Sequence, residues 1–433
     1  MLTRAELLGQ LMTNYDVPIA ISGTHGKTTT TSMLSHILLA GELDPTISVG
    51  GILKAIGGNI RVGNSEYFVT EACEYTNSFL HFFPKIGVIL NIDEDHLDFF
   101  KDLADIRNSF HRFAKLLPKD GTLVINDNIP DLEEITADLD CRVIRYGNDS
   151  SLDYSATNIL HDKKGEASFD LVKSGEFIDR ISLSVNGDHN VSNALSAIAV
   201  ADLLGVPFTK IKEGLKSFHG TDRRFEYKGE VNGVTVIDDY AHHPTEINAT
   251  LTAAKEYPHK EIWCIFQPHT YTRTKALFPE FVDALTHADH VILADIYAAR
   301  ETDTLGMSSE MIAEELKKKG CDAYYFPSFE EIENFCLDKC QKGDVLITMG
   351  AGNVVNIGEN LLKTLVIHII HTILSTKKSD FDSKISFSPS SRCYNVSTMK
   401  RKIQKSSGGG RGIIMKELKT YEVCTDERDC TGQ

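Results

Sequence analysis

Short apolar runs alternate with helix-like stretches along the first part of the chain. Runs at residues 18–22, 67–70, 86–90 and 121–126 have the length of buried strands, and helix-like segments lie between them. A helix is also expected at residues 4–12, ahead of the first strand. Strands that alternate with helices predict a parallel α/β sheet.

Polar and apolar residues alternate more strictly between residues 150 and 186. A period of two is typical of half-buried strands, and we place these as antiparallel strands at the edge of the same sheet. An Ala- and Leu-rich helix is predicted from Asn190 to Leu204, and Gly205 and Pro207 end it.

A second series of strands and helices begins near Arg223. Its predicted strands are residues 234–237, 262–266, 290–294 and 344–348. Pro244 opens a helix through Lys255, because proline suits the first helical turn. This series predicts a second open, doubly wound sheet.

The periodic pattern ends near residue 364. Residues 375–412 are rich in Ser and Lys and include three consecutive glycines at 408–410. We therefore expect residues 364–433 to form a disordered or poorly packed C-terminal tail. The apolar run at 364–374 is too short to span a bilayer and contains two histidines.

Composition narrows the class of protein. A length of 433 residues suggests two or three domains, and a net charge of −16 argues against a general nucleic-acid surface. No charged-then-apolar leader opens the chain, and nine scattered cysteines are typical of reduced thiols. We expect a cytoplasmic protein that acts on small molecules, with no nucleic-acid or membrane partner.

The first predicted strand leads directly into a Gly- and Thr-rich loop and then a helix. Glycines let backbone N–H groups surround phosphate oxygens, the helix N-terminus adds positive potential, and the Lys27 and Thr28 side chains can reach terminal phosphates and Mg²⁺. The alternative is a chance turn, which the strand–loop–helix context disfavours. The candidate nucleotide-binding residues here are Gly23, Thr24, His25, Gly26, Lys27, Thr28 and Thr29.

Two acidic segments follow later strands of the same sheet. Glu71 ends the strand at 67–70, and His96 lies in the acidic segment after the strand at 86–90. In such a sheet the carboxyl ends of strands open into the ligand crevice, so Glu71 is placed to hold Mg²⁺ and His96 is a candidate metal ligand. The alternatives are a capping or surface Glu and an ordinary loop His.

Further polar residues mark the Ala-rich helix and the second block. Asn190 and Asn193 lie three apart, so one face could present both amides to an adenine edge, although helix capping is an equal alternative. Arg223 or Arg224 could deliver a guanidinium to the γ-phosphate, or form a solvated edge.

Two more segments of the second block follow predicted strands. Residues 238–245 combine two carboxylates with His242 and His243 at a strand end, which fits catalytic, substrate or ribose contacts. His269 and Arg273 could hold an anionic substrate. The glycines at 350–352 are weak evidence for close approach of a ligand.

In their order and spacing, these segments resemble the Mur ligases. The resemblance extends from about residue 2 to about residue 363. Within the family, it is strongest to the members that add L-alanine to UDP-N-acetylmuramate. The Ala-His-His-Pro element at 241–244 distinguishes them from folylpolyglutamate synthases. The matching stretches are residues 23–31, 71–75, 91–98, 187–194, 223–226, 238–246, 266–274 and 350–353. The resemblance implies that ATP phosphorylates the lactyl carboxylate and that L-alanine then attacks the acyl phosphate, releasing ADP and phosphate.

The resemblance also implies residue roles. Lys27 would hold the β- and γ-phosphates, Thr28 and Glu71 the first Mg²⁺, and Glu71 and His96 a second Mg²⁺. The residues implied at the nucleotide are His189, Asn190 and Asn193 at the adenine, with Arg224 and Asp239 reaching it from the C-terminal domain. The residues implied at the amino-acid and muramoyl end are His242 and His243, with His269 and Arg273 close by. The implied catalytic set is Lys27, Glu71, His96, Arg224 and His243. Many relatives carry a carbamoylated lysine, and Lys115 lies in the general region without being assigned.

The expected architecture is therefore a central P-loop ATPase-like domain at 1–222, a Rossmann-like C-terminal ligase domain at 223–363 and an unmatched tail at 364–433. Family members begin with a UDP-binding domain that this chain is expected to lack, which predicts retained nucleotide binding with weak or absent ligation. Alternatives are a murein-tripeptide recycling ligase, an inactive ATP-binding fragment or, least favoured, a general P-loop kinase or ATPase. We expect a monomer or homodimer.

Overall fold

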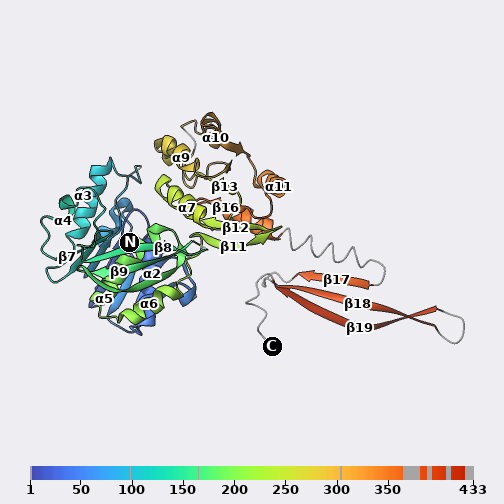
Figure 1. Ribbon diagram of the computed structural model, residues 1–433, viewed down its shortest axis with the longest axis horizontal. Helices are drawn as coiled ribbons and strands as arrows, with labels where there is room; N and C mark the ends of the chain where they lie inside the picture. The colour runs from blue at the N-terminus through green and yellow to red at the C-terminus, as the bar shows by residue number, and fades with distance from the viewer. Residues whose placement is uncertain are drawn as a thin grey trace. The chain divides into compact units, whose positions relative to one another are not determined.

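Two helix-covered sheets make up residues 2–358 in the computed structural model (Figure 1). The structure describes residues 2–97, 99–163, 165–302 and 305–363 with side chains, and the backbone of three strands beyond them. We call the first sheet with its helices the first lobe and the second sheet with its helices the second lobe. Both lie in one unit, and residues 359–433 form another.

The first sheet has ten strands in the order β10-β9-β8-β7-β6-β5-β1-β4-β2-β3. Their bounds are β1 (Val17–Ser22), β2 (Thr46–Leu53), β3 (Gly58–Arg61), β4 (Tyr67–Glu71), β5 (Ile86–Ile89), β6 (Thr122–Asn126), β7 (Arg142–Gly147), β8 (Tyr154–His161), β9 (Glu166–Lys173) and β10 (Glu176–Asn186). The strands from β2 across to β8 pair in parallel, whereas β3, β9 and β10 join antiparallel. The antiparallel edge predicted for residues 150–186 is therefore confirmed.

Alternate residues of the central strands pack into two different cores. Ile19 and Ile21 belong to one cluster and Ala20 to the other, as side chains on a strand point to opposite faces. Both faces are covered by helices, so the strand is a continuous apolar run and not an alternating one.

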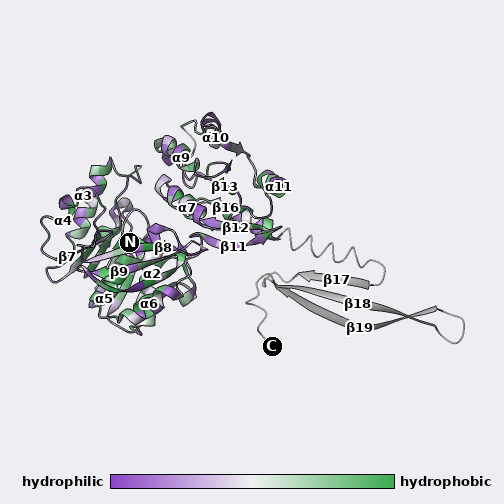
Figure 2. Cartoon of the chain, viewed as in Figure 1, coloured by the Kyte–Doolittle hydropathy of each residue, from purple (hydrophilic) through white to green (hydrophobic). Residues whose placement is uncertain are grey.

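Helices cover the two faces of this sheet. The bounds on the first lobe are α1 (Arg4–Met12), α2 (Lys27–Ala40), α3 (Leu103–Ala114), α4 (Glu133–Thr136), α5 (Asp188–Leu203) and α6 (Phe208–Ser217), with short 3₁₀ helices η1 (Lys54–Ile56) and η2 (Tyr75–His81). Residues of α2, α5 and α6 share one core with the sheet, and residues of α1, η2, α3 and α4 share the other. Figure 2 shows hydrophobic residues gathered where α2 and α5 meet the strands. The predicted helices at 4–12 and 190–204 are confirmed.

Helices α2 and α6 approach each other closely at Gly214. A Cβ added there would lie 2.5 Å from the Cα of Ile37. We expect Gly214→Ala to lower the free energy of unfolding by about 1–3 kcal/mol, because overpacking outweighs the better helix propensity of Ala. Urea unfolding measures this. Gly58→Ala is the control, since nothing lies within 4 Å of its added Cβ, and equal effects of the two substitutions would contradict the close-packing explanation.

The second sheet has the order β11-β12-β16-β13-β14-β15, with only β11 antiparallel. Its strands are β11 (Glu226–Val231), β12 (Val234–Asp239), β13 (Ile262–Phe266), β14 (His290–Leu293), β15 (Asp322–Tyr325) and β16 (Val345–Met349). Its helices are α7 (Pro244–Glu256), α8 (Tyr271–Ala276), α9 (Phe278–Leu285), α10 (Ser309–Lys318) and α11 (Phe329–Lys339). The predicted second open sheet and the helix opened by Pro244 are confirmed.

Trp263 is the only tryptophan of the chain and lies on β13. Its ring stacks on His290 with centroids 3.8 Å apart, and its indole Nε1 donates to Asp344 at 3.2 Å. The side chain is 5% exposed. This contact joins three neighbouring strand segments of the second lobe.

The segment that we expected to be poorly ordered contains three strands, β17 (Phe381–Phe387), β18 (Cys393–Lys405) and β19 (Arg411–Cys424), which pair antiparallel. The prediction of disorder differs from the structure for these strands, because no sustained alternation in the sequence signals them. The rest of residues 364–433 lies outside the described residues. The boundary between the two lobes at 222/223 stays a prediction.

Candidate active site

The carboxyl ends of three neighbouring strands bring the first-lobe candidates together. β1 lies between β4 and β5, with Ile21 paired to Glu71 and Ser22 paired to Ile89. Three segments therefore begin side by side at one sheet edge: residues 23–26, which we call the phosphate loop, the residues that follow Glu71, and the loop at 91–97. Ligands of open α/β sheets bind at this edge.

Two glycines shape the phosphate loop. Gly23 has φ 144° and Gly26 has φ 85°, a region that L-residues rarely adopt. A Cβ on Gly26 would lie 2.6 Å from Asn193 Oδ1, and one on Gly23 would lie 2.8 Å from Leu90 Cβ. The loop therefore needs glycine at both positions for its backbone and for its packing against α5 and the residue that follows β5.

The loop at 91–97 anchors the phosphate loop. The backbone N–H of His25 donates to Asn91 Oδ1 at 2.7 Å, and Asn91 Nδ2 donates to the His25 carbonyl at 3.0 Å. Thr24 and Asp93 are hydrogen-bonded in the same way, through the Asp93 N–H and Thr24 Oγ1 at 2.9 Å. These bonds couple the two loops.

The Lys27 ammonium lies against its own loop. Its Nζ donates to the carbonyl of Gly23 at 2.5 Å, to that of Thr24 at 3.0 Å and to Glu74 Oε2 at 2.8 Å. Burial opposes a charged lysine, but the charge of Glu74 outweighs it and raises the pKa of Lys27. Lys27 is therefore charged at neutral pH.

The side chains of Thr28 and Glu71, the expected ligands of the first Mg²⁺, are in direct contact. Thr28 Oγ1 donates to Glu71 Oε2 at 3.1 Å, and the other Glu71 oxygen accepts from the Gly50 N–H at 2.5 Å. A hydroxyl and a carboxylate oxygen side by side are donors that suit Mg²⁺.

The structure does not pair His96 with Glu71. The carboxylate nearest to His96 on the β4 side is that of Glu74, with His96 Nε2 and Glu74 Oε1 3.6 Å apart. The Tyr75 ring packs on the imidazole, with the ring centroids 4.5 Å apart. Burial lowers the pKa of His96 despite the carboxylates of Asp95 and Glu74, so the ring is neutral at pH 7. The contacts of Glu71 and His96 are with other residues, and their shared role at a second Mg²⁺ stays a prediction.

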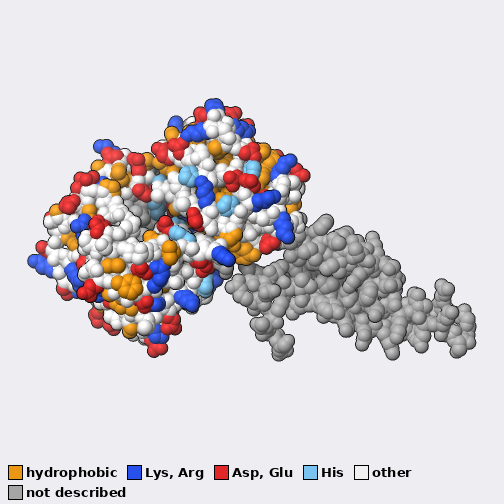
Figure 3. Space-filling view, viewed as in Figure 1, with side chains coloured by type: hydrophobic (Ala, Val, Ile, Leu, Met, Phe, Trp, Pro, Cys, Tyr) orange, Lys and Arg blue, Asp and Glu red, His pale blue; other side chains and the backbone are white. Residues whose placement is uncertain are grey.

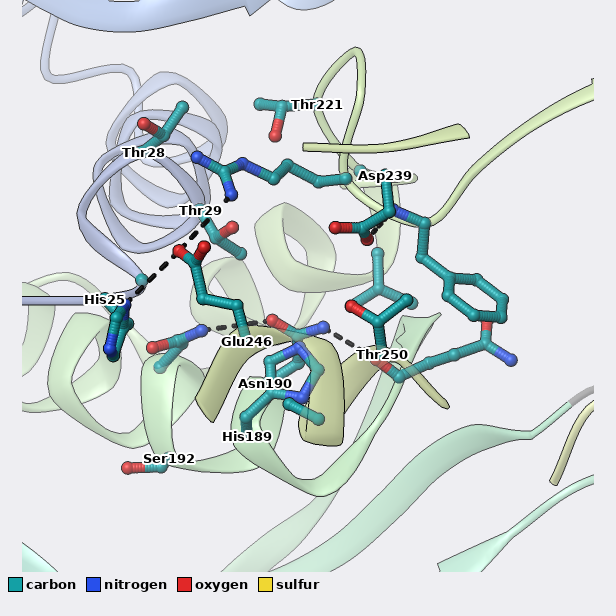
Figure 4. A pocket seen from close by; sticks show the side chains of 18 of the residues that line it. His25, Thr28, Thr29, His189, Asn190, Ser192, Thr221, Asp239, Glu246 and Thr250 are labelled. Carbon is teal, nitrogen blue, oxygen red and sulfur yellow. Dashed lines mark hydrogen bonds and ion pairs between the residues drawn. The ribbon is translucent and has the colours of Figure 1, made fainter. Parts of the chain in front are cut away.

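A cavity of about 370 Å³ lies between the phosphate loop, α5 and the second lobe. Figure 4 shows its labelled side chains converging from these elements. The predicted residues on its wall are His25, Gly26, Thr28, Thr29, His189, Asn190, Asn193, Arg224 and Asp239. Gly23, Thr24 and Lys27 are not on this wall. The volume falls within the usual range for a small-molecule site.

Asn190 and Asn193 form a fixed polar pair on this wall. Asn193 Nδ2 donates to Asn190 Oδ1 at 3.1 Å, and Asn190 Nδ2 donates to the Asn186 carbonyl at 2.7 Å. Both side chains are largely buried. The pair lies on one face of α5, as the three-residue spacing predicts.

The structure distinguishes the two adjacent arginines. Arg223 is held by Asp238 at 3.0 Å and by the carbonyls of Gly352 at 3.1 Å and Gly350 at 2.6 Å, so it joins loops of the second lobe. Arg224 lines the cavity and packs over the Tyr240 ring at 5.0 Å. Of the two, Arg224 is the one placed to reach a nucleotide.

Asp239 is a buried acid at the end of β12. Its oxygens accept from the N–H groups of Phe225 and Ala241, each at 2.7 Å. Burial raises its pKa to about 6, although Arg224 and these N–H donors oppose the rise. Asp239 shapes the loop as well as the cavity wall.

His25 lies between two carboxylates. Its Nε2 is 3.3 Å from Asp93 Oδ2, and its Nδ1 is 3.3 Å from Glu246 Oε1 at the start of α7. Figure 4 shows the His25–Glu246 contact across the cavity. Burial would lower the pKa of His25, but the two acids outweigh it and raise the pKa to about 9. His25 is thus an imidazolium at neutral pH and joins the two lobes.

Glu246 contacts positively charged side chains of both lobes. Its Oε2 accepts from the His242 backbone N–H at 3.0 Å, and Arg224 lies 3.9 Å from its Oε1. Burial opposes ionisation, but His242 and His25 lower the pKa of Glu246 well below its usual value. The carboxylate is therefore ionised across the neutral range.

A second cavity of about 500 Å³ opens on the other side of the 91–97 loop. Arg273 lies on its wall and donates to Asp95 at 3.0 Å, and it also bonds His269 Nδ1 at 3.1 Å. Burial and the neighbouring cations lower the pKa of His269 to about 4, so its neutral ring accepts from Arg273. The Arg273 charge outweighs burial and lowers the pKa of Asp95.

The adjacent histidines of the second lobe have different contacts. His243 caps α7, accepting from the Thr245 N–H at 3.3 Å through Nδ1, so its Nε2 carries the proton and donates to the Glu94 carbonyl at 3.0 Å. The His242 ring is 5.7 Å from that of His269. His243 thus joins the lobes, and His242 lies toward the second cavity.

Four acids of the site were not among the predicted site residues: Glu74, Asp93, Asp95 and Glu246. All four lie inside motifs that were singled out, but spacing alone does not show which acid of a motif faces inward. Lys115 lies outside the site: it bonds Asp138 at 2.8 Å and its side chain is 46% exposed.

Comparisons with known proteins identify the family. Residues 21–201 match the Mur ligase middle domain, and residues 223–352 match the Mur ligase glutamate ligase domain. The chain belongs to the Mur ligase family, whose members are ATP-dependent amino-acid ligases.

Within that family, a UDP-N-acetylmuramate–L-alanine ligase from Agathobacter rectalis is 61% identical over 363 residues, covering 84% of this chain and 79% of the relative. A solved UDP-N-acetylmuramate–alanine ligase from Thermotoga maritima has a TM-score of 0.69 at 28% identity, covering 86% of this chain and 79% of that one. A murein peptide ligase from Psychrobacter arcticus has a TM-score of 0.63 at 26% identity, and the match covers 83% of this chain and 80% of that one.

The helices of the described residues give no membrane-spanning candidate, because each is too short or too polar to cross a bilayer.

Proposed function

We propose that this chain joins L-alanine to the lactyl carboxylate of UDP-N-acetylmuramate, using ATP to activate the acid. The γ-phosphoryl group passes to the carboxylate, which gives an acyl phosphate and ADP. The amine of L-alanine then attacks the acyl carbon, the amide forms and inorganic phosphate leaves. The relatives with this printed activity and the arrangement of the two cavities support the proposal.

The observation that carries the proposal is the loop at 91–97, which contributes to both cavities. Asn91 and Asp93 line the first, and Glu94, Asp95 and His96 line the second. A nucleotide bound in one and an acid bound in the other meet along this loop. Such positioning is the main requirement of phosphoryl transfer, which needs little covalent chemistry from the protein.

The nucleotide side is proposed to use charge from both lobes. Lys27 holds the terminal phosphates from the first lobe, and Arg224 approaches them from the second. The adenine is proposed to lie against Asn190, Asn193 and His189. The wall formed by the second lobe excludes water, which would otherwise hydrolyse the acyl phosphate.

Thr28 and Glu71 are proposed to hold Mg²⁺, because their oxygens are hard donors 3.1 Å apart. When bound, the ion neutralises charge on the phosphates and polarises the transferred group.

The acid side is proposed to use Arg273 and His269 as carboxylate contacts. The Arg273 guanidinium donates to the neutral His269 ring. His243, which joins the lobes through the Glu94 carbonyl, holds the 91–97 loop against the second lobe.

We also propose that the protein acts in the cytoplasm and is a monomer or a homodimer. The six cysteines described with side chains are free thiols, which fits a reducing compartment. Acidic and basic side chains are interspersed over the face in Figure 3, as expected for a protein of small-molecule substrates.

A substrate assay tests the proposal. With ATP, Mg²⁺ and UDP-N-acetylmuramate, we expect ADP release that depends on L-alanine, with a kcat/KM for L-alanine at least about tenfold above that for the murein tripeptide. Mass spectrometry identifies the product, and hydroxylamine traps the acyl phosphate as a hydroxamate when no amino acid is present. A preference for the tripeptide would favour the recycling ligase, and nucleotide binding without substrate-dependent ADP release would favour an inactive fragment.

A further inference from the structure

Thr221 carries a buried hydroxyl that none of the roles above uses. The residue is 3% exposed, and its Oγ1 has no hydrogen-bond partner among the described residues. Burying a hydroxyl without a partner costs free energy, so such a group calls for a ligand or a functional reason. Of the buried hydroxyls without a partner in the described part of the chain, only that of Thr221 belongs to the wall of a cavity, the first one.

A tight turn between the two lobes places Thr221 on that wall. The Arg224 N–H donates to the Thr221 carbonyl at 3.2 Å, so both residues belong to the same turn. Arg223 and Phe225 have φ of 62° and 47°, in the left-handed region that L-residues rarely adopt. Backbone strain of this kind costs free energy and is kept where the position of the side chains serves a function.

Contacts with the end of β12 hold the turn in this conformation. Arg223 Nε donates to Asp238 at 3.0 Å, and the Phe225 N–H donates to Asp239 at 2.7 Å. The two residues with left-handed backbone are therefore the two that are tied to this strand. The turn is thus fixed from the second lobe, and Thr221 is held on the cavity wall before any ligand binds.

The orientation of the hydroxyl indicates which part of a nucleotide it would meet. Figure 4 shows the Thr221 hydroxyl directed into the cavity, on the side of Thr28 and away from His189. Thr28 lies just after the phosphate loop, whereas His189 is proposed to lie against the adenine. A hydroxyl can donate its proton to a phosphate oxygen, and a hydrogen bond to a charged acceptor is stronger than one between neutral groups. A phosphate oxygen is therefore the acceptor that fits Thr221.

We propose that Thr221 donates a hydrogen bond to a phosphate oxygen of the bound nucleotide, beside the charge of Arg224. The inference rests on the proposed function, because that function places the nucleotide in the first cavity. Thr221 lies between α6 and β11, on the segment that joins the two lobes. The bond therefore ties the nucleotide to this joining segment.

Calorimetry with the non-hydrolysable analogue AMP-PNP and Mg²⁺ tests this proposal without turnover. We expect Thr221→Val to bind AMP-PNP about tenfold more weakly than wild type, because it loses a hydrogen bond to a charged group. Thr221→Ser keeps the hydroxyl and should bind nearly as tightly as wild type. The urea midpoint of Thr221→Val should equal or exceed that of wild type, since a methyl group of similar size replaces an unpaired hydroxyl.

Ser155→Ala is the matched control. Ser155 Oγ is also buried without a partner among the described residues, but the residue lies on β8 and belongs to neither cavity wall. This variant should bind AMP-PNP as wild type does.

Two deoxynucleotides distinguish a phosphate contact from a ribose contact. The probes are 2′-deoxy-ATP and 3′-deoxy-ATP, measured without the acid substrate so that no turnover occurs. Each lacks one ribose hydroxyl and keeps all three phosphates. Thr221→Val should therefore lose as much affinity for both probes as it loses for AMP-PNP.

The outcomes are distinct. Unchanged AMP-PNP affinity in Thr221→Val overturns this inference alone, and so does a loss that vanishes with one of the deoxynucleotides, which assigns Thr221 to the ribose. Weaker binding together with a lower urea midpoint indicates a structural role and overturns it as well. A wild-type chain that binds no AMP-PNP overturns the proposed function, and this inference with it. If Thr221→Val does not fold, Thr221→Ala removes the same hydroxyl and decides in the same way.

Discussion

Replacing Lys27 with Gln is expected to remove ATP-dependent ligation and to destabilise the fold at the same time. The ammonium donates to the carbonyls of Gly23 and Thr24 in the phosphate loop, and loss of one such charged group lowers kcat by about 10²–10³-fold. The substitution also leaves Glu74, which is 2% exposed, without its partner at 2.8 Å. Removing one member of a buried ion pair costs about 3–5 kcal/mol. ADP release and urea unfolding measure the two effects.

The double variant separates the two consequences. Lys27→Gln combined with Glu74→Gln should recover most of the free energy of unfolding, because no buried charge remains unpaired, but it should not recover activity. Lys115→Gln is the matched control, since its partner Asp138 is 60% exposed and such a pair contributes little. Wild-type stability in Lys27→Gln would show that the Lys27–Glu74 pair does not hold the loop.

Raising the pH from about 6.5 to 9.5 is expected to lower the free energy of unfolding, because His25 loses its proton. The acids Asp93 and Glu246 raise the pKa of His25 to about 9 from 6.5, even though burial acts the other way. A raised folded-state pKa gives stability that is fully present below 6.5 and is lost as the pH passes through 9. The linked free energy is about 3 kcal/mol.

Urea unfolding across this pH range, in wild type and in His25→Gln, measures the effect. The wild-type free energy of unfolding should fall by about 3 kcal/mol more than that of the variant. His259→Gln is the control, because the His259 ring bonds only the nearby Tyr257 carbonyl at 2.7 Å among the contacts described, and it should keep the wild-type profile. Parallel profiles for wild type and His25→Gln would mean that the two acids do not hold a proton on His25.

The order of the elements could be read from the sequence because local patterns determine it. The central strands are apolar on both faces, as Ile19, Ala20 and Ile21 illustrate. The first helix has a local start signal as well, since Thr3 and Glu6 form a capping box at Arg4–Met12. Such signals need only neighbouring residues. The strands β2, β3, β7, β11 and β15 were not predicted, because exposed or half-buried positions interrupt their apolar residues.

The candidate site could be predicted only in part, because it depends on contacts between distant segments. Glu71 and Glu74 are three residues apart, and the sequence does not show that Thr76 and Asn77, with φ of 55° and 57°, turn the chain there. The role of Glu246 depends on His25, which lies more than two hundred residues earlier. Its contact exists only because α7 begins opposite the phosphate loop. Pairings of this kind are set by the tertiary fold and not by spacing.

Trp263 gives the second lobe its own optical signal. Since the chain has no other tryptophan, emission excited at the red edge of the indole band comes from β13 alone, where the ring packs on His290. Circular dichroism, by contrast, averages over the helices of both lobes. If the two signals change at the same urea concentration, the lobes unfold as one cooperative body. If the indole emission changes first, the second lobe opens while the first still holds its phosphate loop.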